Sequence, residues 1–140
     1  MDGLKHGFGR WKKFTNHSVN IYEGQYANDK KEGFGIFKWA SGNKYIGHYK
    51  NDKREGIGQM MWTDGSIYIG EWKEGIQHGY GYMYFPDGTV KEGLFEKNSS
   101  IPVSIFFQYQ LYPLPLFAVI FHFYQISFLN EELCHLSKFS

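Results

Sequence analysis

Glycine pairs separated by one residue are the feature of this sequence closest to a chemical motif, because glycine-rich loops can bind phosphate groups. The pairs are Gly7 and Gly9, Gly33 and Gly35, Gly56 and Gly58, and Gly79 and Gly81. A nucleotide loop also needs a Lys-Ser/Thr step after its last glycine, and a dinucleotide loop needs a third glycine that opens a helix. Neither pattern occurs around these pairs. We therefore interpret them as strand glycines and predict no nucleotide site.

The six histidines and the single cysteine do not form a metal set. His6 and His78 occupy the same position of a repeated motif, which indicates a turn residue. His17 and His48 have no histidine, cysteine or carboxylate at ligand spacing. Cys134 has no second cysteine to pair with, which favours a reducing compartment. We predict no metal, no cofactor and no catalytic residues.

The charge balance gives no field that would attract nucleic acid, because the formal net charge is +1. The mildly basic patch comprises Lys5, Arg10, Lys12 and Lys13. Each basic residue near an anionic membrane contributes about 1 kcal/mol, so this patch predicts only weak, salt-sensitive lipid contact. We expect no nucleic-acid partner.

The distribution of glycine divides the chain into two parts. All 17 glycines lie between Gly3 and Gly93, and aromatic residues make up 20% of the chain. Glycine is a poor helix former and aromatic residues prefer sheets, so this part is predicted to be mainly β. Residues 98–130 contain neither glycine nor a charged residue. We expect an array at 1–97 and an apolar tail at 98–140.

A repeat of 23 residues organises the first part. Tyr22-Glu23-Gly24-Gln25-Tyr26 returns at 45–49 as Tyr-Ile-Gly-His-Tyr and at 68–72 as Tyr-Ile-Gly-Glu-Trp, and a degenerate copy starts at Lys91. Each of the three full copies continues with a polar segment, a glycine pair and a Ser-Gly or Asp-Gly step. Residues 2–9 match 74–81, so the chain begins in the middle of a repeat, as a natural cap or an incomplete sequence would.

Each repeat predicts a β-hairpin. Alternation puts Tyr45, Gly47 and Tyr49 on one face and Ile46 and His48 on the other. The polar segment at 51–55 has turn composition, and the Asp-Gly or Ser-Gly step leads into the next hairpin. The predicted fold is an elongated, twisted, single-layer antiparallel meander of tandem hairpins. A three-residue insertion is expected in the loop around 14–18.

The glycines of the array are expected to interlock with its aromatic residues. A strand glycine packs nothing itself, and a cross-strand aromatic over the empty position offsets this cost. Gly33, Gly35 and Gly47 are placed beside the aromatics in the inferred sheet. The structural glycines predicted in this way are Gly24, Gly33, Gly35, Gly47, Gly56, Gly58, Gly70, Gly79 and Gly81.

The pattern Tyr-x-Gly-x-Tyr/Trp, polar turn, Gly-x-Gly and Asp/Ser-Gly at a spacing of 23 resembles the MORN repeat over residues 1 to about 97. The resemblance implies a scaffold or adaptor at a membrane–cytoskeleton junction, in cilia, or attached to an enzyme as a regulatory module. It also implies anionic-lipid contact in some members and a helical partner segment in the aromatic groove of others. Lys91 departs from the pattern, because it stands where the other copies have tyrosine.

We therefore predict a non-catalytic scaffold that binds a protein partner on its glycine and aromatic face. The alternative is a regulatory fragment of a longer enzyme of the lipid kinase or methyltransferase type. The oligomeric state is not predicted. The candidate contact residues are Tyr22, Tyr26, Tyr45, Tyr49, Trp62, Tyr68 and Trp72.

The tail contains an uncharged apolar run of 19 residues at 111–129, which is just long enough to span a bilayer as a helix. Pro113, Pro115, His122 and Gln125 interrupt it. Three interpretations stay open: a membrane anchor, an apolar helix packed on the array, or translated non-coding sequence. The polar first ten residues lack the apolar core of a secretory signal. We expect the chain in the cytoplasm, with a membrane or cytoskeletal site left open.

Overall fold

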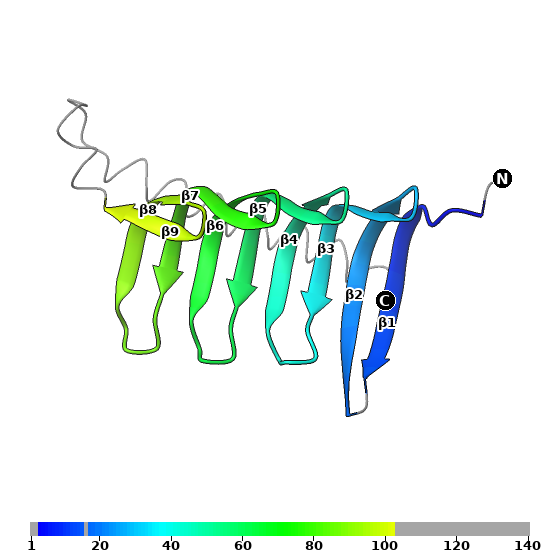
Figure 1. Cartoon of the computed structure of the whole chain (residues 1–140), viewed down its shortest axis with the longest axis horizontal. Helices are drawn as coiled ribbons and strands as arrows, with labels where there is room; N and C mark the ends of the chain where they lie inside the picture. The colour runs from blue at the N-terminus through cyan, green and yellow to red at the C-terminus, as the bar shows by residue number, and fades with distance from the viewer. Residues whose placement is uncertain (1–2, 16, 103–140) are drawn as a thin grey trace.

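The array forms a single open sheet of nine antiparallel strands, hydrogen-bonded in the order in which they follow one another along the chain (Figure 1). This computed structural model describes residues 3–15 and 17–102. The predicted meander of hairpins is confirmed. The apolar tail helix falls outside the described residues, whereas the sheet continues to Pro102, past residue 97. The strands are β1 (Gly7–Thr15), β2 (Ser18–Ala27), β3 (Lys30–Lys38), β4 (Lys44–Lys50), β5 (Lys53–Met61), β6 (Ile67–Lys73), β7 (Ile76–Tyr84), β8 (Val90–Glu96) and β9 (Ser99–Pro102).

Two-residue turns form a row along one edge of the sheet, at the top of Figure 1. Asn51 and Asp52 link β4 to β5 with φ angles of 48° and 69°. Both central residues of a type I′ turn need positive φ, and this turn matches the twist of the flanking strands. Equivalent turns at 28–29, 74–75 and 97–98 also have positive φ at both positions. The hairpins therefore share one geometry at this edge.

Longer loops form the opposite edge of the sheet. In the loop after β3, Trp39 N–H donates to Asn43 O at 2.9 Å, and Gly42 supplies a φ of 97°. The same two features recur in the loops after β5 and β7. The predicted insertion near residue 16 lengthens the first hairpin: β1 and β2 have 9 and 10 residues, whereas β4 and β6 have 7.

A row of glycines crosses the sheet from β1 to β8, because the register pairs each of them with a glycine of the next strand. The tyrosine that opens a repeat lies over one such pair. A Cβ atom at Gly58 would come within 2.2 Å of the Tyr45 hydroxyl, and one at Gly47 within 2.6 Å. The same holds for Tyr22 and Tyr68. The predicted interlocking of glycine and aromatic residues is present along this row. Its members are Gly9, Gly24, Gly35, Gly47, Gly58, Gly70, Gly81 and Gly93.

The first glycine of each Gly-x-Gly pair has a different role, which corrects the expectation for Gly33, Gly56 and Gly79. The register shifts where Gln25 of β2 faces residues 32–34 of β3. The Gln25 Oε1 atom accepts a hydrogen bond from Phe34 N–H at 2.9 Å, and a Cβ at Gly33 would lie 1.9 Å from that oxygen. Gly33 also has a φ of 74°. It clears space for a polar side chain and allows the local bend; it does not lie under an aromatic ring.

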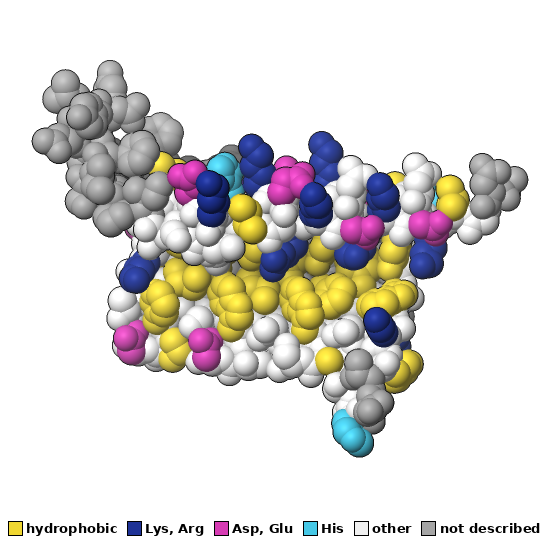
Figure 2. Space-filling view, viewed as in Figure 1, with side chains coloured by type: hydrophobic (Ala, Val, Ile, Leu, Met, Phe, Trp, Pro, Cys, Tyr) yellow, Lys and Arg dark blue, Asp and Glu magenta, His cyan; other side chains and the backbone are white. Residues whose placement is uncertain are grey.

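The aromatic side chains pack against one another on one face of the sheet. Figure 2 shows them as a continuous apolar belt between two polar margins. Tyr45 contacts Tyr49 and Trp72 edge-to-face, each with ring centroids 5.3 Å apart. Tyr68 contacts Trp72 at 5.3 Å and Phe95 at 4.9 Å in the same manner. Each tyrosine thus links its own repeat to the next, and aromatic contact takes the place of a conventional core.

Hydrogen bonds between residues 21 positions apart also join successive repeats. Asp52 N–H donates to Lys31 O at 3.0 Å, and the Asp52 carboxylate accepts from Lys31 N–H at 2.9 Å. Two repeats further along the chain, Asn98 and Gln77 form the same reciprocal pair. At the intervening position, Gly75 N–H donates to Arg54 O at 2.9 Å. Gly75 has no side chain to return the bond.

Candidate functional site

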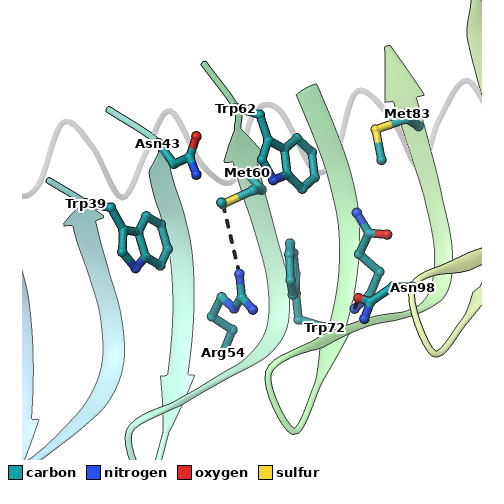
Figure 3. A pocket seen from close by; sticks show the side chains of 9 residues that line it. Trp39, Asn43, Arg54, Met60, Trp62, Trp72, Met83 and Asn98 are labelled. Carbon is teal, nitrogen blue, oxygen red and sulfur yellow. Dashed lines mark hydrogen bonds between the residues drawn. The ribbon is translucent and has the colours of Figure 1, made fainter. Parts of the chain in front are cut away.

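A groove of about 560 Å³ crosses β5 to β7 on the aromatic face. Figure 3 shows Trp39, Trp62 and Trp72 with their rings around it. Met60 and Met83 add flexible apolar surface, and the polar part comes from one guanidinium and three amides. The lining residues are Trp39, Asn43, Arg54, Met60, Trp62, Trp72, Gln77, Met83 and Asn98.

The repeat builds the groove, because equivalent positions of successive hairpins lie side by side. Trp39 and Trp62 are equivalent, and so are Met60 and Met83. Two strand spacings separate equivalent residues, which is about 9.6 Å. The groove therefore presents apolar side chains at a regular interval along the array.

The groove continues past Trp39 toward the first repeats. A smaller hollow of about 300 Å³ is lined by Phe37, Trp39 and Tyr49, together with charged residues near the two-residue turns. A third hollow of about 280 Å³ lies against β1, with Trp11 and Tyr26 in its wall. These hollows extend the apolar surface across most of the array.

Arg54 is the cation of the groove. Its guanidinium carbon lies 4.3 Å from the ring centroid of Trp72 and 5.7 Å from that of Tyr45. The guanidinium donates to Gly75 O, and Nη1 lies 4.0 Å from Met60 Sδ, at the limit of a weak contact (Figure 3). The side chain is half-buried. Burial lowers the pKa of Arg54, and the neighbouring Tyr49 and Tyr45 oppose that shift. Arginine stays protonated at physiological pH even so.

Lys31 occupies the equivalent position one repeat earlier and has a carboxylate partner, which Arg54 lacks. The Lys31 ammonium lies 5.7 Å from the Tyr22 ring centroid and pairs with the Asp52 carboxylate at 2.8 Å. Burial raises the pKa of Asp52, but hydrogen bonds and the charge of Lys31 outweigh it, so the pKa is lowered overall. Gly75 stands where Arg54 would need an aspartate. Arg54 makes no ion pair with a carboxylate of the described residues.

A comparison with protein-family models identifies the repeat. The MORN repeat matches residues 1–15, 22–44, 45–67 and 68–90, which is more than half of the chain. The chain belongs to the MORN-repeat family. No curated protein matches it. The family is in general a repeat and binding module, found in scaffold and membrane-associated proteins.

The three tyrosines that open the MORN repeats are predicted to contact a partner, but they are buried in the aromatic packing of the sheet. This corrects their predicted role. Tyr22, Tyr45 and Tyr68 are each 0% exposed. The Tyr45 hydroxyl donates to His48 O at 3.0 Å, and Tyr22 and Tyr68 bond their own repeats in the same way. Ring packing over two glycines and this internal bond leave nothing for a partner to contact. Their function is to hold the hairpins together.

The other predicted contact residues are divided between interior and groove. Tyr49 is buried. Trp72 is also buried, and its Nε1–H donates to Gly58 O at 3.1 Å, but one side of it reaches the groove. Trp62 lines the groove and Tyr26 lines the hollow against β1; both are partly exposed.

The groove residues that are not among the predicted contacts are Trp39, Arg54, Met60 and Met83. For Trp39, Met60 and Met83 a signal is present on the return side of each hairpin, where aromatic or methionine residues recur at the repeat spacing. It was overlooked because the Tyr-x-Gly-x-Tyr block repeats more faithfully. Faithful repetition marks the residues that build every hairpin, whereas the groove residues vary from copy to copy.

No group of three or more histidine, cysteine, aspartate or glutamate side chains among residues 3–15 and 17–102 could hold a metal ion. Over the same residues, no helix is long and apolar enough to cross a membrane.

Proposed function

We propose that this MORN array is a non-catalytic scaffold that docks an apolar segment of a protein partner in its aromatic groove. The observation that carries the proposal is the groove wall, in which Trp39, Trp62 and Met83 are partly exposed. Aromatic residues and methionine are enriched at protein interfaces, and exposed apolar patches mark interaction sites.

A helix fits the spacing of this groove. Seven residues of an α-helix rise about 10.5 Å, close to the interval of about 9.6 Å between equivalent positions of successive hairpins. Apolar residues seven positions apart on one helix would therefore meet Trp39 and Trp62 in turn. We propose an amphipathic helical segment that lies across the strands, parallel to the array.

Selection from a displayed library of 16-residue helical peptides on the full chain tests this proposal. We expect enriched peptides with apolar residues at heptad spacing. Their binding should fall at least about tenfold with Trp39→Ala, since truncation of an aromatic anchor at an interface costs about 2 kcal/mol or more. Phe14→Ala is the matched control, because Phe14 is 76% exposed and lies outside the groove. No enrichment, or equal losses with both variants, would refute the proposal.

The cellular site is a separate proposal that depends on the tail. We propose a cytoplasmic protein that the apolar run at 111–129 attaches to a membrane. The full chain should then remain with membranes in carbonate and high salt, while a chain ending at Pro102 is released. The weak basic patch alone would be screened at that ionic strength. Release of both chains would exclude the anchor.

A further inference from the structure

We infer that Arg54 recognises a carboxylate on the docked segment, which makes the partner an acidic amphipathic helix. This inference rests on the proposed function and specifies the partner's chemistry. It comes from the break in the repeat at Gly75, where the groove cation loses the carboxylate that its equivalent Lys31 keeps.

The described residues of the groove offer Arg54 no neutralising charge. They include three amides, from Asn43, Gln77 and Asn98, and no acid. Asp52 lines the adjoining hollow, but its carboxylate is held by both the backbone and the ammonium of Lys31. Among the described residues, the half-buried guanidinium bonds one carbonyl and touches one thioether, so it retains donors for an anion.

The surroundings of Arg54 favour a carboxylate on a protein over a lipid headgroup. The guanidinium fork matches a carboxylate in two parallel hydrogen bonds. Trp72 lies against one face of the guanidinium and Trp39 is 6.0 Å away, so the anion must arrive among apolar side chains. A membrane surface is held by several basic residues together, and among the described residues of this lining Arg54 is the one cation. On a helix, an acidic residue three or four positions from an apolar anchor lies on the same face. Its carboxylate can therefore reach Arg54 while the anchor packs against the groove aromatics.

The test uses the peptides enriched on the full chain. Enriched sequences should share a glutamate or aspartate, and its change to the amide should weaken binding about tenfold or more, as for loss of one partner of a desolvated charge pair. On an Arg54→Gln chain the acid and amide peptides should bind equally. Glutamine is the residue of choice because Gln77 occupies the equivalent position in the next repeat. A thermal melt checks that this chain is folded.

Gly75→Asp is the sharper variant, because it changes neither Arg54 nor any groove aromatic. A Cβ at Gly75 meets nothing within 4 Å. Its φ of 89° is tolerable for aspartate, since Asp52 and Asn98 hold φ values of 69° and 66° at equivalent positions. The new carboxylate should pair with Arg54 as Asp52 pairs with Lys31. We expect acid peptides to bind this chain about tenfold more weakly, and amide peptides to be unaffected.

The outcomes separate this inference from the proposed function. Peptides that need Trp39 but show no preference for acid over amide would overturn the carboxylate and leave groove docking intact. Failure to enrich any peptide would overturn both. Phosphatidylserine vesicles test an anionic lipid as the competing ligand. If the chain binds these vesicles, Arg54→Gln abolishes that binding, and the peptides show no preference for acid over amide, then Arg54 binds lipid and the inference is refuted.

Discussion

The unit of this fold at the residue scale is one tyrosine lying over two glycines. The Tyr68 ring covers Gly70 and Gly81, where Cβ atoms would come within 2.5 and 2.6 Å of its hydroxyl. That hydroxyl donates to Glu71 O at 2.9 Å, so the polar end of a buried ring is satisfied inside its own repeat. The three residues specify one another: a side chain at either glycine would displace the ring.

Gly58→Ala tests this unit. The new methyl group would lie 2.2 Å from the Tyr45 hydroxyl, so the ring must shift and overpacking should cost about 1–3 kcal/mol of unfolding free energy. Gly9→Ala is the matched control in the same glycine row, because its Cβ would meet Tyr26 at an ordinary 3.4 Å. Urea denaturation measures both. Equal stability of the two variants would contradict the packing described here.

The buried tyrosines predict loss of stability at high pH. Burial raises the pKa of Tyr68 from its usual 10.0, and the charge of Glu71 adds to the shift. The unfolded chain therefore loses this proton first, so stability is full below pH 10 and falls as pH rises above it. Each such tyrosine contributes a slope of up to about 1.4 kcal/mol per pH unit.

Denaturation curves between pH 9 and 12 measure this slope for the natural chain and for Tyr68→Phe. The variant should be less stable at every pH, because its hydroxyl bond is gone, but its stability should fall less steeply above pH 10. Parallel pH profiles would show that Tyr68 ionises as readily in the folded chain as in the unfolded one.

At the scale of the element, the hairpins were predictable and their bends were not. The 23-residue period and the alternation in segments such as 45–49 suffice to give antiparallel hairpins, because strand geometry has a period of two. The register shift at Gln25 depends on a side chain bonding the backbone of the next strand, which no periodicity encodes. Gly33 was therefore assigned to the wrong partner.

The groove was only partly predictable for a related reason. The polar segment at 51–55 was correctly read as a turn, but its last residues belong to β5, where Arg54 lies in the groove. Strand alternation alone does not reveal that an arginine stacks on Trp72, because that contact joins different hairpins. The prediction that Tyr45 contacts a partner is wrong for a different reason. A repeated aromatic residue can be buried in the packing between hairpins as well as exposed on a binding surface.

The turn at 74–75 gives a prediction for a single hairpin. Glu74 adopts a φ of 53°, a left-handed conformation that costs most residues energy but suits asparagine. Asparagine occupies the equivalent positions 28 and 51. Glu74→Asn should therefore raise the melting temperature slightly, because the Lys53 ion pair that it removes is mostly exposed and contributes little. Asn51→Ala is the converse variant and should lower it. A lower melting temperature for Glu74→Asn would show that the ion pair matters more than the turn.

At the scale of the whole molecule, each strand bonds only the strands beside it in the chain. The bonds between residues 21 apart and the aromatic contacts likewise reach only the neighbouring repeat. Stability in such an array is a sum of local hairpin terms and interfaces between neighbours. A partner helix that lies across several hairpins would add a connection that the array itself lacks, which is a physical reason for binding to stiffen it.

Hydrogen exchange followed by mass spectrometry can measure this one-dimensional coupling. Central strands have two neighbours and interfaces on both sides, so amide protection should be highest in β4 to β6 and lower toward β1 and β9. Gly58→Ala should speed exchange in β4 to β7, where the displaced Tyr45 and Trp72 rings make their contacts, and leave β1 unchanged. Gly9→Ala serves as the control and should leave β4 to β7 unchanged. Uniform acceleration across all strands in the Gly58→Ala chain would mean that the sheet opens as one cooperative unit, contrary to the nearest-neighbour picture.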